Sequence, residues 1–253
     1  TFCVNSTSQD LFFSLGGTPQ AGGTWSPTLS SGTGVFNPQV DAPGIYTYAF
    51  AGTQPCDSDS AVVEVVINPI PDAGQKGDAF FCTNYPPENL FLSLSGTPQP
   101  GGTWSPALAS GTGVFNPIVD AAGIYTYTLT GAPPCTDVSA SVNVSIFPAP
   151  NAGTSGAANL CSNGSPIDLF TYLGGNPQTG GTWTPTLTSG TNILDPSIDL
   201  AGNYTYTIIG VSPCSNATAI VTVGITPGPN AGNDGKATFR TNSTSHDLSF
   251  SLG

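Results

Sequence analysis

Hydrophobic and polar residues alternate along several short segments of this chain. The clearest segment is SASVNVSIFP (139–148), in which Val142, Val144 and Ile146 fall at every second position and Ser or Asn fills the positions between. A period of two places successive side chains on opposite faces of an extended backbone. The segment therefore predicts a β-strand with one buried face and one polar face.

Two further segments have the same period. GIYTYTLTG (123–131) places two tyrosines and a leucine on one side. NLFLSLSG (89–96) is predicted to be a strand whose buried face carries Leu90, Leu92 and Leu94. Glycine and proline bound these segments, and no segment shows a helical period. The pattern therefore predicts an all-β protein.

The same strand pattern occurs three times with a period of 79 residues. The phrase GGTWSP or GGTWTP marks each copy, and its tryptophans are Trp25, Trp104 and Trp183. Proline-rich junctions, such as NPIPDAG at 68–74, separate the copies and predict short, semi-rigid linkers. An edge strand interrupted by proline is the alternative for these segments. We therefore expect repeats at 1–69, 70–148 and 149–227 and an incomplete fourth repeat at 228–253, as part of a longer protein.

Each repeat holds six or seven short predicted strands, which favours an antiparallel β-sandwich. In the second copy, Gly101 and Gly102 are expected to form a turn, followed by a short strand that contains Trp104 and ends at Pro106. We interpret the three tryptophans as large core residues of the sandwich. The alternative is an exposed tryptophan that stacks on a sugar ring.

Six cysteines occur at two fixed phases of the repeat. Because each complete repeat carries one cysteine at each of these two positions, we predict one disulfide per domain. The predicted pairs are Cys3–Cys56, Cys82–Cys135 and Cys161–Cys214. A metal site is not expected, because two cysteines per repeat without a partner histidine cannot complete a tetrahedral site. Disulfides would place the chain in an oxidising, extracellular compartment.

Composition excludes several classes of partner. Three basic residues stand against fifteen acidic ones, for a net charge of −12, so no nucleic acid and no anionic membrane surface is expected to bind. No stretch approaches the ~18 apolar residues of a membrane span, so membrane insertion is not expected either. Although only 7% of residues are charged, 38% are hydrophobic and fall in regular runs, which favours ordered domains over disorder.

The run DAAGIYTY (120–127), with partners at 41–48 and 199–206, resembles the Asp-x-Gly-x-Tyr run that leads into strand F of immunoglobulin-like (Ig-like) domains. The resemblance implies that one tyrosine per copy bonds back to the backbone as a corner tyrosine and that the aspartate caps the turn. The corner tyrosines would be Tyr46, Tyr125 and Tyr204, and the capping residues Asp41, Asp120 and Asp199. Tyrosine replaces the immunoglobulin cysteine two residues later, so the expected fold is Ig-like.

The phrases GTPQ, GGTWSP, SGTGVFNP and AGIYTYT together resemble the Ig-like arrays of giant surface proteins of Bacteroidota, particularly flavobacteria. Gliding-motility adhesins exported by the type IX secretion system are among them. The resemblance implies a bacterial cell-surface location and an extended stalk or filament. Its implied partners are neighbouring repeats, surface polysaccharides or other copies in a filament. It also implies O-glycosylation at Asp-Ser/Thr motifs, of which Ser60 is a candidate.

No catalytic set is evident, so the chain is not expected to be an enzyme. The sole histidine, His246, lies beside Asp247, but the other copies do not repeat the pair and no partner serine is apparent. No cofactor is expected. Calcium at the junctions is the alternative, with oxygen ligands from Asp72, Asp78, Asn151, Asn230 and Asp234. The set is not maintained between copies, since Ala157 takes the phase of Asp78.

These features favour non-catalytic spacer repeats of an extracellular adhesin or filament. Two alternatives remain at this stage: lectin-like modules that bind glycans, and subunits that exchange strands in an extracellular fibre. In the fourth copy Arg240 stands at the position of the first cysteine, so whether that repeat forms a disulfide is left open.

Overall fold

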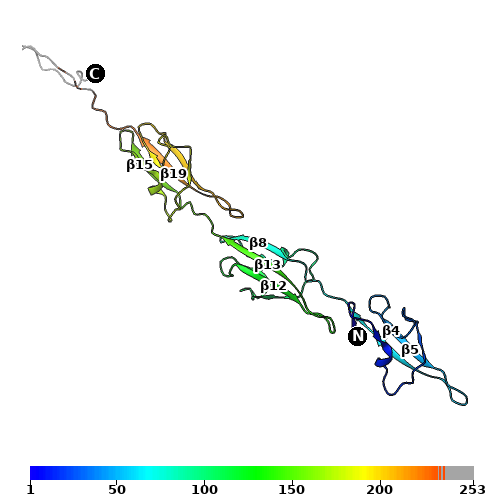
Figure 1. Ribbon diagram of the computed structural model, residues 1–253. Helices are drawn as coiled ribbons and strands as arrows, with labels where there is room; N and C mark the ends of the chain where they lie inside the picture. The colour runs from blue at the N-terminus through cyan, green and yellow to red at the C-terminus, as the bar shows by residue number, and fades with distance from the viewer. Residues whose placement is uncertain (233, 235, 237–253) are drawn as a thin grey trace, which may run out of the picture. The chain divides into compact units, whose positions relative to one another are not determined.

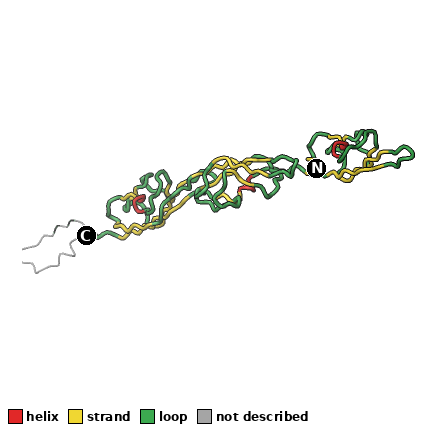
Figure 2. Tube along the Cα trace, turned by 90° about the horizontal axis from the view of Figure 1, so that it is seen from below, coloured by secondary structure: helices red, strands yellow, loops and turns green. Residues whose placement is uncertain are grey.

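The computed structural model describes residues 1–232, 234 and 236. These residues form an all-β protein that contains no α-helix in the described part of the chain; each repeat adds one short 3-10 turn to its strands (Figure 1, Figure 2). No helix among the described residues is long and apolar enough to cross a membrane. The chain divides into two compact units, Thr1–Phe147 with the first two repeats and Pro148–Gly253 with the third.

The second repeat shows the architecture most simply. Its elements are β8 (Gly77–Cys82), β9 (Glu88–Asn89), η2 (Leu90–Ser93), β10 (Thr103–Ser105), β11 (Val114–Phe115), β12 (Gly123–Leu129) and β13 (Val138–Phe147). One sheet has the strand order β10-β12-β13-β8, and β9 pairs with β11 in a second layer. The long strands β12, β13 and β8 lie side by side in Figure 1.

The other two repeats have the same plan. The third repeat consists of β14 (Gly156–Cys161), β15 (Ile167–Asp168), η3 (Leu169–Tyr172), β16 (Thr182–Thr184), β17 (Ile193–Leu194), β18 (Gly202–Ile208) and β19 (Ala217–Thr226). The first repeat consists of β1 (Phe2–Cys3), β2 (Gln9–Asp10), η1 (Leu11–Ser14), β3 (Thr24–Ser26), β4 (Val35–Phe36), β5 (Gly44–Phe50), β6 (Asp59–Val65) and β7 (Ile67–Asn68). The tandem Ig-like sandwich class is confirmed, with six or seven strands in each repeat.

The sheet is mixed rather than purely antiparallel, which corrects one detail of the expectation. The first strand of each repeat pairs in parallel with the last: β8 with β13, β14 with β19, and β1 with β7. In the second repeat this register aligns Gly77 with Val142 and Cys82 with Phe147. The first strand therefore ends where the last strand ends, and this register decides where the cysteines lie.

The core of each repeat lies between its two layers. In the second repeat Leu90 and Phe115 contribute from the smaller layer, and Tyr125 and Val142 from the larger sheet, all nearly inaccessible to solvent. The first and third repeats have separate cores built from the corresponding positions. The period-two predictions for 123–131 and 139–148 are confirmed as β12 and β13, with their alternate residues buried.

The prediction of a strand over 89–96 was wrong. Residues Leu90–Ser93 form a 3-10 turn, in which Leu90 and Leu94 are buried while Leu92 is 81% exposed. The side chain of Asn89 accepts a hydrogen bond from the backbone N–H of Phe91 (3.0 Å) and so caps the turn. This cap favours a turn over a continued strand, and Asp10 and Asp168 make the same cap in the other repeats.

The repeated Gly-Gly pair has a specific partner that the sequence did not indicate. The hydroxyl of Tyr127 accepts a hydrogen bond from the backbone N–H of Gly102 (2.8 Å) and donates one to the carbonyl oxygen of Gln99 (2.8 Å). A Cβ on Gly102 would lie 2.6 Å from the tyrosine ring, so only glycine allows this approach. Gly101 has a φ of 104°, a region that favours glycine. Tyr48 and Tyr206 hold the same loop in the other repeats.

Candidate functional site

The candidate functional site is the junction at which one repeat is bonded to the next. The loop between the last two long strands of each repeat is here called the tip loop; it spans 51–58, 130–137 and 209–216. We call the cysteines of these loops the leading cysteines, which are Cys56, Cys135 and Cys214. The cysteines that end the first strand of each repeat are the trailing cysteines, Cys3, Cys82 and Cys161.

The leading and trailing cysteines of one repeat lie at opposite ends of its sheet. Cys82 is aligned with Phe147 at the end of β13, whereas Cys135 precedes the start of β13 at Val138. β13 is ten residues long and so spans about 30 Å. A disulfide requires Cα atoms within about 7 Å of each other, so the two cysteines of one repeat cannot be bonded.

The observed disulfide joins consecutive repeats. Cys3 is bonded to Cys135, with Cα atoms 4.9 Å apart and a separation of 132 residues in the chain. In Figure 1 the loop between β12 and β13 accordingly ends beside the N-terminus. The trailing cysteine of a repeat lies at the end of the sheet where the last strand ends. The leading cysteine lies at the opposite end of the sheet, where the last strand starts. The disulfide therefore joins the far end of the first repeat to the tip loop of the second.

The predicted pairs Cys3–Cys56, Cys82–Cys135 and Cys161–Cys214 were therefore wrong. Cys3 and Cys135 are bonded to each other, and Cys56 and Cys161 carry free, exposed thiols. Cys82 and Cys214 are each disulfide-bonded. The 79-residue period cannot distinguish pairing within a repeat from pairing between consecutive repeats. A separation of 53 residues and a separation of 132 residues both recur with that period. Only the parallel register of the first and last strands separates them.

The tip loop is a compact turn with the same hydrogen bond in all three repeats. The backbone N–H of the leading cysteine donates to the carbonyl oxygen three residues earlier, at 2.9 Å in each case. In the second repeat the backbone N–H of Gly131 also donates to Asp137 Oδ1 (3.0 Å). A Cβ on Gly131 would collide with the carbonyl oxygens of Cys135 and Thr136, so glycine lets the two arms of the loop close.

The tip loop of the second repeat lies against the last residues of the first. Asn68 Nδ2 donates a hydrogen bond to the carbonyl oxygen of Pro133 (2.8 Å), and Cys135 Sγ lies 3.4 Å from the carbonyl oxygen of Asn68. Within the third repeat's unit, Cys214 Sγ lies 3.5 Å from the carbonyl oxygen of Pro148, one period after Pro69. The leading cysteines of two repeats therefore contact the same junction position, since Cys135 Sγ lies 3.5 Å from the Pro69 carbonyl oxygen.

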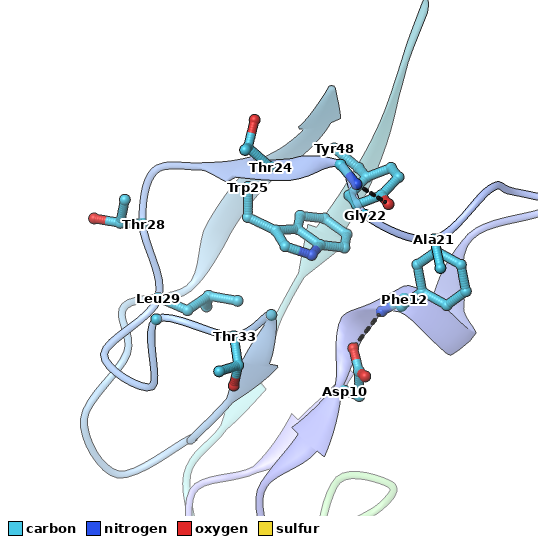
Figure 3. A pocket seen from close by; sticks show the side chains of 13 residues that line it. Asp10, Phe12, Ala21, Gly22, Thr24, Trp25, Thr28, Leu29, Thr33 and Tyr48 are labelled. Atoms are coloured by element: carbon cyan, nitrogen blue, oxygen red, sulfur yellow. Dashed lines mark hydrogen bonds between the residues drawn. The ribbon is translucent and has the colours of Figure 1, made fainter. Parts of the chain in front are cut away.

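A second feature is the pocket beside the tryptophan of each repeat. In the first repeat a pocket of about 460 Å³ is lined by Trp25, Tyr48, Phe12 and Asp10 (Figure 3). Trp25 packs against Tyr48 with ring centroids 5.1 Å apart. The pocket of the second repeat has a volume of about 450 Å³.

The tryptophans are not equivalent, which refines their interpretation as core residues. Trp183 is buried, and its Nε1 donates a hydrogen bond to Asn192 Oδ1 (3.0 Å), in a pocket of only about 200 Å³. Gly34 and Gly113 take the place of Asn192 in the other copies. Trp25 and Trp104 are half-buried, and among the described residues no acceptor is bonded to their indole N–H groups.

The corner tyrosines make the bond that the resemblance implied. The hydroxyls of Tyr46, Tyr125 and Tyr204 each donate to the carbonyl oxygen four residues earlier, at 2.8 Å. Burial raises the pKa of each of these hydroxyls, and the negative charge of the aspartate in the same corner raises it further. These tyrosines therefore remain neutral donors through the physiological pH range.

The corner aspartates connect two loops. Asp199 Oδ1 accepts hydrogen bonds from the backbone N–H (2.9 Å) and the hydroxyl (2.6 Å) of Thr188, and its Oδ2 accepts one from the N–H of Asp195 (2.8 Å). Asp41 and Asp120 accept the corresponding backbone bonds. Burial opposes the ionisation of Asp199, but the hydrogen bonds outweigh it and hold its pKa below the ordinary value of 3.8. The same balance lowers the pKa of Asp41.

The described part of the chain contains no group of three or more His, Cys, Asp or Glu side chains that could hold a metal ion. Asp72 accepts bonds from the N–H of Gly74 (2.8 Å) and the hydroxyl of Thr97 (2.9 Å), and Asp78 accepts one from Asn143 Nδ2 (3.3 Å). Ser60 is exposed at the start of β6. His246, Asp247 and Arg240 lie outside the described residues.

Comparisons with known proteins give only distant likenesses. No family model and no curated protein matches the chain. Among solved structures, titin domains I67–I69 share 15% identity at a TM-score of 0.36, covering 82% of this chain and 84% of that one. Drosophila OTK extracellular domains 3–5 share 14% (TM-score 0.34; 78% and 77% covered), and Sidekick-1 immunoglobulin domains 1–5 share 15% (TM-score 0.30; 81% and 52% covered). Likenesses at this level do not bear on what this chain binds.

The hydrogen bonds of Asp199 predict an acid-sensitive third repeat. A carboxyl group with a pKa depressed by folding stabilises the protein above its ordinary value of 3.8, and this contribution is lost as the pH falls below that value. Asp199→Asn should therefore lower the free energy of unfolding by about 1–3 kcal/mol at neutral pH and by less near pH ~2. Unfolding followed by Trp183 fluorescence, in a Trp25→Phe/Trp104→Phe background, measures it.

Asp168→Asn is the matched control within the third repeat, because Asn89 makes the same cap at the equivalent position of the second repeat. We expect this variant to be as stable as the parent at neutral pH. An Asp199→Asn variant as stable as the parent at neutral pH would show that the corner carboxylate does not stabilise the repeat.

Proposed function

We propose that this chain is a load-bearing spacer in an extracellular adhesion protein or filament and that it has no catalytic role. The observation that carries the proposal is the disulfide between Cys3 and Cys135, because a bond between consecutive repeats resists their separation. A disulfide confined to one domain would stabilise that domain without connecting it to its neighbour. The neighbouring repeats are thus the first partners of each repeat.

The connection shortens the covalent path along the chain. Tension applied at the two ends passes from Cys3 directly to Cys135 and bypasses the 131 residues between them. The bypassed segment covers most of the first two repeats, so its length stays hidden even after their cores unfold.

The surroundings support an extracellular location. Disulfides persist in oxidising compartments, and a net charge of −12 keeps such chains soluble and mutually repelling. The likeness of the repeat phrases to Bacteroidota surface arrays favours a bacterial cell surface, export by type IX secretion and a role in gliding or attachment. Ser60, exposed within its Asp-Ser-Ala motif, is a candidate site for a glycan on this surface. Calcium is not part of this proposal: at the junction between the first two repeats Asp72 accepts hydrogen bonds from a protein N–H and a protein hydroxyl group.

Single-molecule pulling tests the load-bearing role. In a Cys82→Ser/Cys214→Ser variant only the Cys3–Cys135 disulfide remains, and it hides about 450 Å of chain at full extension. We expect the unfolded oxidised molecule to be shorter than the reduced one by that length. Adding Cys56→Ser, which replaces a free thiol, should leave the difference unchanged. Equal lengths before and after reduction would contradict the proposal.

A second candidate function is glycan binding, favoured by the open pockets of the first two repeats. Each contains an aromatic platform, threonine hydroxyls and an indole N–H without a protein acceptor in the described part of the chain. Sugars bind to such combinations of a stacking face and hydrogen-bonding groups. The third repeat offers a built-in comparison, because Asn192 already occupies the position beside Trp183.

Tryptophan fluorescence separates this candidate from a purely structural role. A Trp183→Phe variant reports only Trp25 and Trp104, whereas a Trp25→Phe/Trp104→Phe variant reports only Trp183. If the pockets bind glycans, uncharged oligosaccharides should change the emission of the first variant and leave that of the second unchanged. No response from the first variant across an oligosaccharide panel would exclude the candidate.

A further inference from the structure

The pocket beside each tryptophan contains one position at which the third repeat differs from the other two. Gly34 and Gly113 stand at this position in the first two repeats, and Asn192 stands there in the third. The carbonyl oxygen of each of these residues accepts a hydrogen bond from the backbone N–H of the leucine that begins the 3-10 turn, at 3.0 Å in all three repeats. The three positions are therefore equivalent in the fold, although glycine supplies no side chain at two of them.

In the third repeat the chain fills this position with an amide of its own. Asn192 Oδ1 accepts a hydrogen bond from Trp183 Nε1 (3.0 Å). The pocket there has a volume of only about 200 Å³, and of the described residues Asp168, Phe170 and Tyr206 are not part of its lining. Their counterparts in the first repeat all line the larger pocket. The surrounding fold therefore accommodates a carboxamide at this position, and the carboxamide satisfies the indole N–H.

In the first two repeats glycine leaves a niche at this position, bounded by a donor and an acceptor. A Cβ on Gly34 would lie 2.7 Å from Trp25 Nε1 and 3.4 Å from Asp10 Oδ1. For Gly113 the distances to the indole nitrogen and to Asn89 Oδ1 would be 3.1 Å and 3.8 Å. In Figure 3 the indole nitrogen of Trp25 lies on the side of the ring that faces Asp10. The niche therefore adjoins a side-chain oxygen and an indole N–H that has no acceptor among the described residues.

We propose that the niches beside Trp25 and Trp104 bind the acetamido group of an N-acetylated sugar, in the place that the carboxamide of Asn192 takes in the third repeat. The inference rests on the glycan-binding candidate described above and names the class of glycan. The carbonyl oxygen of the acetamido group accepts the hydrogen bond of the indole N–H. The amide N–H donates to the side-chain oxygen of Asp10 in the first repeat and of Asn89 in the second.

The apolar part of the pocket favours an acetamido group over a hydroxyl group. Leu29 lines the pocket of the first repeat together with Trp25, and Leu108 takes its place in the second repeat. The methyl group of an acetamido group is stabilised when it is buried against such a leucine. A hydroxyl group could bond to the same donor and acceptor but has no apolar part to bury.

A comparison of the two pockets indicates that the ligand is uncharged. Asp10 of the first pocket is replaced by Asn89 in the second, while the volumes remain about 460 and 450 Å³. Both side chains present the same oxygen, since Oδ1 of each accepts a hydrogen bond from the backbone N–H two residues later. A neutral amide N–H can donate to either oxygen, whereas a cationic group would be attracted only to the carboxylate of Asp10.

The rest of the lining favours a sugar over a peptide as the source of the amide. The rings of Phe12 and Tyr48 pack edge to face with their centroids 5.6 Å apart, and Thr24, Thr28 and Thr33 line the same pocket (Figure 3). A sugar ring carries both apolar faces that pack on aromatic rings and hydroxyl groups that bond to threonines. The pocket volume also lies within the range of small-ligand sites, about 300–1,000 Å³.

Opening the third pocket and comparing two tetrasaccharides tests the proposal in the full chain. In a Trp25→Phe/Trp104→Phe background only Trp183 reports, and adding Asn192→Gly gives the third repeat the glycine of the other two. The tetramer of N-acetylglucosamine should change the emission of Trp183 only after this substitution. In a Trp183→Phe variant, which reports the first two pockets, the same tetramer should bind about tenfold more tightly than the glucose tetramer, because glucose has no acetamido group.

Equal affinity for the two tetrasaccharides would overturn the acetamido inference and leave glycan binding standing, whereas binding of neither would overturn both. A Trp183→Phe variant that responds to an uncharged, end-blocked asparagine peptide but not to the N-acetylglucosamine tetramer would also overturn the inference. So would the absence of any Trp183 response in a folded Asn192→Gly variant. If that variant does not fold, the comparison of the two tetrasaccharides in the Trp183→Phe variant decides the proposal.

Discussion

The parallel pairing of the first and last strands of each repeat is the constraint on which the rest of the structure depends. Because β8 runs in the same direction as β13, Cys82 ends beside Phe147, at the far end of the sheet from Cys135. The register therefore prevents a disulfide within a repeat and presents one thiol at each end. Two repeats in series then bring unlike cysteines together, as Cys3 and Cys135 show.

Within each repeat, hydrogen bonds made by carboxylates and tyrosine hydroxyls hold the loops in place, as ion pairs do in more basic proteins. With fifteen acidic residues and only three basic ones, most carboxylates have no cation to pair with. Asp199 instead accepts hydrogen bonds from Thr188 and Asp195, and Tyr127 bridges Gly102 and Gln99. These bonds hold long loops against a thin core, and they keep a strongly acidic chain folded without salt bridges as its main support.

Features that depend on local periodicity and on repetition could be predicted from the sequence. Alternation along 139–148 predicted β13, and the 79-residue period predicted a tandem array. The 3-10 turn at Leu90 was missed, because leucines at every second position also fit a strand, and the cap from Asn89 decides between them. The disulfide partners could not be predicted from the sequence, because they depend on a strand pairing between residues 65 positions apart. The smaller pocket beside Trp183 could have been expected from the sequence, because Asn192 replaces the glycine that stands at Gly34 and Gly113 in the other repeats.

The most direct measurement of the central claim is disulfide mapping of the non-reduced chain. The chain has only three basic residues, so cleavage after aromatic residues gives smaller fragments than cleavage after Lys and Arg. The account predicts a fragment containing Cys3 bonded to one containing Cys135, with Cys56 recovered as a free thiol in the monomer. A fragment containing Cys3 bonded to one containing Cys56 would contradict it.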